Sequence, residues 1–238
     1  MPMLMSSGSA LYFDTSFLYL VLPAFILSLA AQFYVRSVFK RYSAMASVQR
    51  IPAEQVARDL LDRNGCAEVR METVAGDLTD HYDPRNRVLR LSQTTSGSSS
   101  VAAIGVAAHE AGHAIQHETG FLPNRIRSLV APVAGIGSTF GPYLALFGIL
   151  LSLPILTEIG ILLFSAAVVF YFVTLPVEIN ASRRAITALS ETGMLTPEEI
   201  PAARKVLRAA ALTYVASALV SFMTLLRLIL LSRGNRRR

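Results

Sequence analysis

Three histidines and a glutamate stand within nine positions of an otherwise apolar segment, VAAIGVAAHEAGHAIQH (residues 101–117). They are His109, Glu110, His113 and His117. Residues four apart lie on one face of an α-helix, so His109 and His113 can direct two imidazole nitrogens at one ion, while Glu110 can reach a water held there. The spacing predicts a metal-binding helix. The same side chains could instead be core residues, but each would then need its own buried partner.

This H-E-x-x-H arrangement is the pattern of the zincins, in which two histidines bind zinc and the glutamate acts as a general base. Small residues at positions 107, 108, 111, 112 and 114 would let neighbouring elements approach a metal closely. The motif is short, and unrelated helices match it by chance. A catalytic zinc commonly has three protein ligands and one open position, so a further ligand is required elsewhere in the chain.

Two residues are candidates for that third ligand. Ligands at 109, 113 and His117 would spread over about 12 Å of helix rise, too far for one ion, so His117 is expected to support a ligand or to lie at the surface. Glu178, 65 residues after His113, stands on a separate predicted helix and can approach from another direction. Ser182 shares its face and could orient a ligand. Glu178 could also be a solvated residue that favours the helix dipole.

Several separated segments resemble one family, the membrane zinc metallopeptidases of the YugP type. They are HEAGHAIQH, the preceding LTDHYDP and VLRLS, the later LPVEINASRRA, FILSLAAQF in the first apolar stretch and TYVASAL in the last. The resemblance covers most of the chain. It implies a gluzincin-like peptidase with Zn²⁺ bound by His109, His113 and Glu178, and with Glu110 as the catalytic base. More distant quality-control gluzincins usually carry Asp four residues after the ligand glutamate. Ser182 stands there in this chain, so the support of the ligands is expected to differ.

The ligand set predicts peptide-bond hydrolysis by a zinc-activated water, with Glu110 taking the proton and passing it to the leaving amine. The developing oxyanion needs a further donor, for which His81, Tyr82 and Tyr214 are candidates, although each could be an ordinary hairpin or core residue. By analogy with zincins, the strand at 87–92 would pair at a sheet edge with an extended peptide substrate. Arg183 could bind a peptide carboxylate, but a position facing solvent or lipid headgroups is the favoured interpretation.

The composition indicates a membrane protein. Hydrophobic residues make up 53% of the 238 residues, and the mean hydropathy is +0.47, above that of soluble proteins. The net charge is +6, but no aromatic-interleaved basic stripe or known reading motif accompanies it, so no nucleic-acid partner is expected. Juxtamembrane positive charge explains the excess. The single cysteine, Cys66, excludes an intrachain disulfide and a cysteine-based zinc site.

Four apolar stretches are long enough to be candidate spans in the lipid bilayer. They cover residues 16–35, 129–153, 159–175 and 211–232. A cleaved signal peptide competes for the first stretch, but no Lys or Arg precedes it. The middle two are separated at Pro154, Thr157 and Glu158. In the last, Arg227 stands near enough the end to extend its charge to the interface.

Local patterns predict the elements that would position the chemistry. Before the histidines we expect a helix at 53–65 ended by Gly65, a strand at 67–74, a hairpin at 76–92 turning at 83–86 and a flexible connection at 93–100. The histidines themselves lie on a predicted helix at 101–117 capped by Ser100. Later in the chain we expect a helix at 175–193 with Pro176 in its first turn and a capping box at 196–199. The regions are the N-terminal span (1–35), the peptidase region (36–128), a transmembrane hairpin (129–176), the third-ligand helix with the start of a connecting helix (177–210), and the C-terminal span with its basic tail (211–238).

The membrane topology tests the ligand set, because Glu178 and the two histidines must lie on the same side. An even number of crossings must separate residues 128 and 176, and two are predicted. Arg36, Lys40 and Arg41 follow the first span and nothing basic precedes it, so the positive-inside rule places the polar regions in the cytoplasm. The basic residues at 204, 205 and 208 agree. The tail, with arginines at 233 and 236–238, would emerge outside, against the rule.

We therefore expect an α-rich integral membrane protein with about four transmembrane helices and a small α+β zincin-like peptidase unit. The expected activity is zinc-dependent endopeptidase cleavage of peptide or protein substrates on the cytoplasmic side of a bacterial cell membrane, in membrane protein quality control. A catalytically silent zinc-binding scaffold or assembly factor is the alternative, and an intact Glu110 argues against it. A site-2-type intramembrane protease or a metal transporter fits less well, because the spans carry neither a Leu-Asp-Gly motif nor ionisable residues at their centres.

Overall fold

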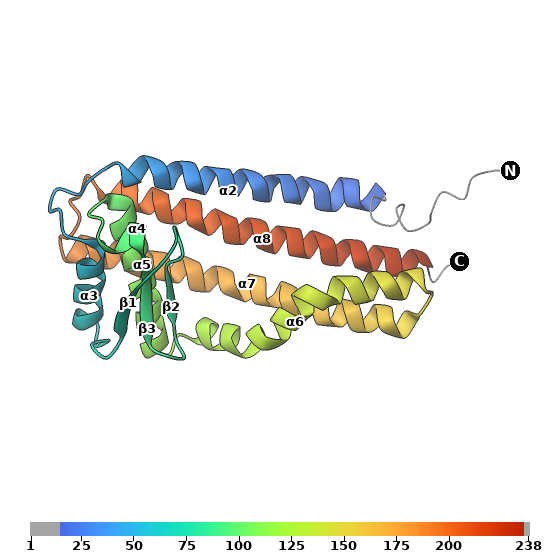
Figure 1. The fold of residues 1–238 in the computed structure, drawn as a ribbon. Helices are drawn as coiled ribbons and strands as arrows, with labels where there is room; N and C mark the ends of the chain where they lie inside the picture. Colours follow the sequence, from blue (N-terminus) through green and yellow to red (C-terminus); the bar gives the residue numbers. More distant parts are fainter. Residues whose placement is uncertain (1–14, 236–238) are drawn as a thin grey trace. The chain divides into compact units, whose positions relative to one another are not determined.

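The computed structural model describes residues 15–235, and the chain folds into two compact units. The mixed unit comprises Gln32–Arg125 and Leu175–Leu212. The helical unit comprises the described parts of Met1–Ala31, Ile126–Thr174 and Thr213–Arg238. Figure 1 gives the order of the elements along the chain. The first 14 residues of the predicted N-terminal region, and Arg236 to Arg238 of the basic tail, lie outside the described residues.

The mixed unit contains a three-stranded sheet in the order β1-β3-β2. The strands are β1 (Arg70–Val74), β2 (His81–Asp83) and β3 (Val88–Ser92). The predicted hairpin is confirmed, since β2 and β3 pair antiparallel with Tyr82 opposite Leu89. The strand predicted at 67–74 begins three residues later, at Arg70, and pairs parallel to β3.

The expectation that the strand at 87–92 forms a free sheet edge is wrong. β3 lies in the middle of the sheet, with β1 on one side and β2 on the other. Its residues Val88, Leu89, Leu91 and Ser92 are buried, as expected for a central strand. The backbone edges open to another strand therefore belong to β1 and β2. Of these two, β2 is the strand that also packs against the helix carrying the histidines.

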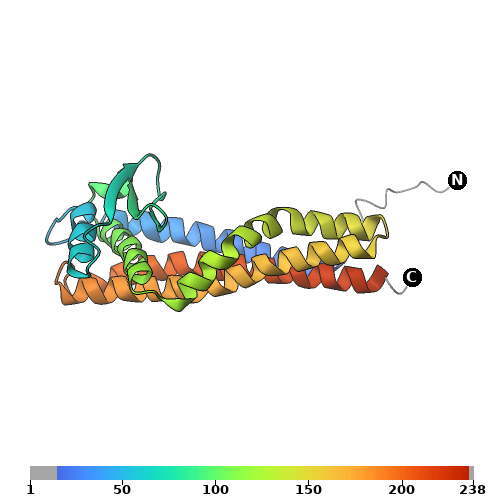
Figure 2. The same cartoon turned by 90° about the horizontal axis from the view of Figure 1, so that it is seen from below.

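Two helices of the mixed unit pack together beside the sheet, α3 (Ala53–Arg63) and α5 (Val101–Glu118) (Figure 2). Apolar residues at helical spacing on α3, such as Val56 and Leu60, face Ile104 and Ala108 of α5 in one core. The predicted stop after α3 is confirmed at Gly65, whose φ of 73° lies in the left-handed region that glycine adopts without strain. This packing fixes α5 from one side.

The connection predicted as flexible at 93–100 is largely ordered. It contains the short helix α4 (Gln93–Ser96), where Thr95 and Ser96 are buried. Asp80 accounts for this order, because its carboxylate accepts hydrogen bonds from the backbone N–H and hydroxyl of Ser92 and from the hydroxyl of Thr95. The hydroxyl groups of a serine just before this linker-like segment and of a threonine within it thus have a hydrogen-bond partner, the carboxylate of Asp80.

Within residues 15–235, four helices are long and apolar enough to cross a membrane. A π-helical turn, η1 (Phe17–Val21), leads into α2 (Leu22–Ser43), which is followed later by α6 (Leu122–Leu150), α7 (Pro154–Glu191) and α8 (Ile200–Asn235). The expected helix-rich membrane protein is therefore confirmed. In the helical unit, α6 and α7 approach closely, because a Cβ added to Gly141 would lie 2.9 Å from the carbonyl oxygen of Gly160. Such small-residue contacts are typical of helices packed in membranes.

The helix predicted to begin near Pro176 does not begin there, because α7 continues through that residue as one helix. Proline removes one backbone donor and crowds the preceding turn, at a cost of about 3 kcal/mol in a helix interior. Burial of Val177, Ala181 and Ala185 along the next turns offsets that cost.

The capping box predicted at 196–199 is present in part, since one of its two hydrogen bonds forms just before α8 begins at Ile200. The buried carboxylate of Glu199 accepts the backbone N–H of Thr196 at 2.8 Å and also that of Val48 at 2.7 Å. The expected extension of Arg227 to the membrane interface stays a prediction. The Arg227 side chain is 5% exposed and lies with its guanidinium 5.6 Å from the centre of the Phe17 ring, so it is packed within the helical unit.

Candidate metal centre

The helix that carries the histidines is fixed at its start and in its middle. The predicted cap is confirmed, since the hydroxyl of Ser100 accepts the backbone N–H of Ala103 at 3.2 Å. Further along α5, a Cβ added to Gly112 would lie 2.8 Å from the carbonyl oxygen of Ala181 on α7. Only a residue without a side chain lets α7 approach so closely. This contact lies one residue before His113 and three residues after Glu178.

The close approach brings His109, His113 and Glu178 together. The Glu178 Oε2 atom is 3.2 Å from His109 Nε2 and 3.5 Å from His113 Nε2. One ligand atom from each of the three residues lies within 4.8 Å of the others. The two imidazole rings stand nearly perpendicular, at 84°, with their centres 4.7 Å apart. Glu178 is only 2% exposed, so its carboxylate faces the histidines rather than solvent.

These distances fit zinc. Tetrahedral zinc with bonds of about 2 Å holds neighbouring ligand atoms about 3.3 Å apart. The two distances from the carboxylate oxygen, 3.2 and 3.5 Å, are close to that value. Two imidazole nitrogens and one carboxylate oxygen are also the donor types of catalytic zinc sites, which leave the remaining position for a reactant. The three residues could therefore hold one zinc ion without rearrangement of the two helices.

Each histidine is bound through its other ring nitrogen. The Nδ1 atom of His109 is 3.1 Å from the hydroxyl of Ser182, and the Nδ1 atom of His113 is 3.1 Å from Oε1 of Gln116. When Nδ1 carries the proton and donates it to these oxygens, Nε2 keeps a free lone pair directed at Glu178. The predicted contact of Ser182 with a ligand residue is thus present. Gln116 was not predicted.

The amide orientation of Gln116 follows from its surroundings. Its nitrogen donates to the backbone oxygen of Val177 at 2.8 Å and to Oδ1 of Asn180 at 3.0 Å. A carbonyl oxygen only accepts, so the atom facing Val177 must be the amide nitrogen and the atom facing His113 must be the oxygen. Arg184, whose Nε donates to the same Asn180 oxygen at 2.9 Å, fixes Asn180 in the same way. The bond pattern therefore requires the proton of neutral His113 on Nδ1.

Glu110 lies beside the first histidine and is 9% exposed. Among residues 15–235, no protein group donates a side-chain or backbone hydrogen bond to its carboxylate. A nearly buried carboxylate without such a partner usually has a functional or solvent-related reason. Its oxygens are free to accept a proton from a molecule held near the two histidines.

His117 does not join the three residues, as the helix rise predicts. Its Nδ1 atom is instead 3.1 Å from the hydroxyl oxygen of Tyr82 on β2. Burial, reinforced by the negative charge of Glu118, raises the pKa of Tyr82 to about 12. The phenol therefore remains protonated at neutral pH and can donate a hydrogen bond. The pair ties β2 to α5 one turn beyond His113.

The remaining predicted residues lie elsewhere. His81 is exposed on β2, and its ring contacts the backbone oxygen of Thr79 and the guanidinium of Arg90 rather than the three candidate ligands. Tyr214 lies on α8 in the helical unit, so its role as a donor stays a prediction. Arg183 is exposed on α7 and lines a cavity that Ser182 also lines.

Two histidines on one helix and a carboxylate on a second are the arrangement of a helix-borne zinc site such as metallopeptidases use. Comparison with known proteins agrees. A family described as "Putative neutral zinc metallopeptidase" matches residues 17–233. The "Putative membrane protease YugP" of Bacillus subtilis (strain 168) is 44% identical over 220 residues, which cover 92% of this chain and 98% of that protein. No solved structure matches the chain significantly. The chain belongs to this family of zinc metallopeptidases, and it is a membrane protein of the peptidase class.

Proposed function

We propose that the protein is a membrane-anchored zinc endopeptidase in which His109, His113 and Glu178 bind Zn²⁺ and Glu110 is the general base. One observation carries the proposal: a single oxygen of Glu178 lies 3.2 and 3.5 Å from the Nε2 atoms of both histidines. The family membership supports zinc as the metal. It also supports hydrolysis of peptide bonds as the reaction class.

Zinc held by these residues would supply Lewis acidity, polarising a carbonyl group and making a coordinated water acidic near neutral pH. The protein side chains supply the rest. Ser182 and Gln116 keep both Nε2 atoms available, and Glu110 takes the proton of the attacking water and returns it to the leaving amine. The free carboxylate of Glu110 favours this enzyme role over the alternative of a catalytically silent scaffold.

The substrate is proposed to be an extended peptide segment that lies along the open edge of β2. This strand packs against α5, and within residues 15–235 only one of its edges is paired, the edge facing β3. Adding a strand there would use the unpaired backbone groups for binding. Tyr82, on the same strand and protonated at neutral pH, is the favoured donor to the oxyanion. His81 and Tyr214 remain the other candidates, and Arg183 remains a candidate contact to a peptide carboxylate.

The site is proposed to face the cytoplasm. The basic residues that follow the first span and those at the start of α8 favour this side. Between the histidines and Glu178 the chain runs through the span-length helix α6 and the apolar first part of α7, so the required even number of crossings is available. A protease at this surface would have access to damaged or membrane-associated proteins, which fits membrane protein quality control.

The test compares purified wild type with Glu110→Gln on unfolded and membrane-protein substrates, with zinc content measured in both. Glu110→Gln should retain zinc and lose cleavage by about 10²- to 10⁴-fold, because the proton acceptor is gone while the ligands remain. The exposed Glu198→Gln is the matched control and should cleave as wild type does. Equal cleavage by wild type and Glu110→Gln would end the assignment of Glu110 and of the enzyme mechanism.

A further inference from the structure

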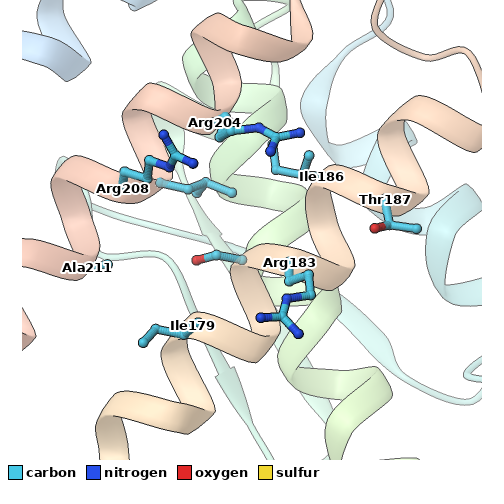
Figure 3. A pocket seen from close by; sticks show the side chains of 9 residues that line it. Ile179, Arg183, Ile186, Thr187, Arg204, Arg208 and Ala211 are labelled. Atoms are coloured by element: carbon cyan, nitrogen blue, oxygen red, sulfur yellow. The ribbon is translucent and has the colours of Figure 1, made fainter.

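A cavity of about 300 Å³ opens between α7 and α8 within the mixed unit (Figure 3). Arg204 and Arg208 come from α8, one turn apart, and Arg183 comes from the facing helix α7. Ile179 and Leu207 contribute to an apolar wall. The cavity thus combines three guanidinium groups with an apolar surface.

The positive charge of this cavity is not compensated by protein carboxylates. All three arginines are exposed, and within the described part of the chain none of them forms an ion pair. No Asp or Glu is among the residues that line the cavity. Like charges that line one hollow repel each other, and this repulsion falls when an anion binds there. Guanidinium groups bind phosphate oxygens through paired hydrogen bonds, so phosphate is a well-matched anion.

The position of the cavity along the chain favours a lipid as the source of that phosphate. Arg208 precedes the apolar stretch 211–232 by three residues, and Ile179 follows the stretch 159–175 by four. Residues at the ends of spans lie at the depth of lipid headgroups. Ile179 is 49% exposed beside the arginines and offers a surface for the start of an acyl chain. Basic pockets between span helices are typical binding sites for anionic headgroups.

We propose that this cavity binds the phosphate headgroup of an anionic phospholipid through Arg183, Arg204 and Arg208. Ser182 lines the same cavity while its hydroxyl contacts His109. A bound lipid would therefore restrain the segment of α7 that carries Glu178 and Ser182. Lipid binding itself does not depend on peptidase activity, so it can be tested independently of the proposed function.

The test uses the purified full chain in nanodiscs of phosphatidylcholine alone or of phosphatidylcholine with phosphatidylglycerol. Phospholipid that stays bound after transfer to detergent is identified by native mass spectrometry. Wild type should retain phosphatidylglycerol and melt at a higher temperature in its presence. The double variant Arg204→Gln/Arg208→Gln should bind it about thirty-fold more weakly, because each arginine near an anionic surface contributes about 1 kcal/mol.

Lys205→Gln is the matched control, because Lys205 is exposed next to Arg204 on the same helix but does not line the cavity. It should bind phosphatidylglycerol as wild type does. If Lys205→Gln lost as much phosphatidylglycerol binding as the double variant, the binding would depend on general surface charge, and the proposal would be overturned. Circular dichroism of the variants reports whether the helices are folded, and Arg204→Lys, which keeps the charge but loses the paired hydrogen bonds, should bind more tightly than Arg204→Gln.

Two further arms distinguish the lipid from other anions. Inorganic phosphate and a short peptide are added as competitors, the peptide once with a free and once with an amidated C-terminus. The proposal expects neither to displace phosphatidylglycerol. Displacement by phosphate at similar concentrations would identify a site for small anions. Displacement by the free peptide but not the amidated one would identify a subsite for a substrate carboxylate. Either result overturns the lipid assignment.

Discussion

The two imidazoles of the candidate metal centre present the same nitrogen, Nε2, to Glu178. This depends on the atoms bound to their Nδ1 positions, which are the hydroxyl oxygen of Ser182 for His109 and the amide oxygen of Gln116 for His113. Hydrogen bonds of this kind fix ring orientation and raise the basicity of a ligand. The affinity for zinc should thus depend on residues that never contact the ion.

Ser182→Ala removes the oxygen bound to His109 and leaves a small residue that suits the α7 helix. Zinc affinity should fall about ten-fold, because the ring loses its orientation and its preferred tautomer. Competition with a chromophoric chelator measures the affinity. Ser182→Thr keeps the hydroxyl and should restore most of it. If the alanine and threonine variants bind zinc equally well, the hydroxyl has no part in positioning His109.

The sequence predicts these residues unevenly. His109, Glu110 and His113 are found from spacing because their arrangement is local to one helix. Glu178 is only a candidate from spacing, since its approach depends on the packing of α7 against α5. Gln116 escaped prediction because its partners, Val177 and Asn180, are 61 and 64 residues away. The one available signal is a glutamine at i+3 from a histidine in an apolar helix, where a buried amide needs partners.

At the scale of elements, the site depends on how closely α5 and α7 approach. Gly112 permits that approach, because any Cβ at this position would collide with the backbone oxygen of Ala181. Gly105 lies two turns earlier on the same helix, and its added Cβ would meet the Ala203 side chain of α8 at 3.6 Å, an ordinary contact. The two glycines therefore form a matched pair with opposite expectations.

Gly112→Ala should push α7 away from α5 and separate Glu178 from the histidines. We expect zinc affinity to fall by about ten-fold or more, the size of loss known for disturbed metal support, while the helical content seen by circular dichroism is retained. Gly105→Ala should bind zinc as wild type does and melt at an equal or higher temperature, because alanine favours helix. A Gly112→Ala protein with unchanged zinc affinity would show that helix separation does not limit the site.

Element predictions failed where distant contacts override local signals. Pro176 predicts a helix start, but burial on both sides of it keeps α7 continuous. The polar run at 93–100 predicts a flexible connection, but Asp80 accepts hydrogen bonds from the hydroxyl groups of Ser92, just before it, and of Thr95, within it. The strand at 87–92 is expected by analogy at a sheet edge, but β1 pairs with it and makes it the central strand. Helix periodicity, the cap of α5 and the hairpin turn were predicted correctly because they are decided within a few residues.

At the scale of the whole molecule, the four candidate spans and the family membership define a multi-pass membrane peptidase. The proposed topology places the β2–β3 turn in the cytoplasm and the turn between α6 and α7 outside. The lone cysteine makes this testable by labelling. Cys66 is fully buried, and burial raises the pKa of its thiol, so the native protein offers little reactive thiolate.

Cysteines introduced singly at exposed positions can therefore be labelled without interference from the native thiol. Arg85→Cys lies in the β2–β3 turn and Ser152→Cys in the turn after α6, and both parent side chains are exposed. In intact expressing cells, an impermeant maleimide should label Ser152→Cys but not Arg85→Cys, and after permeabilisation it should label both. Wild type, with Cys66 alone, should stay unlabelled until denatured. The reverse pattern for the two variants would place the metal centre outside the cell.

The most direct measurement is the zinc content of the purified full chain, determined by elemental mass spectrometry for wild type, Glu178→Gln and Glu110→Gln. Wild type and Glu110→Gln should each contain one zinc ion per chain. Glu178→Gln should lose it on dialysis against a mild chelator that leaves the other two loaded. If Glu178→Gln keeps one zinc with the affinity of wild type, Glu178 is not the ligand that completes the site.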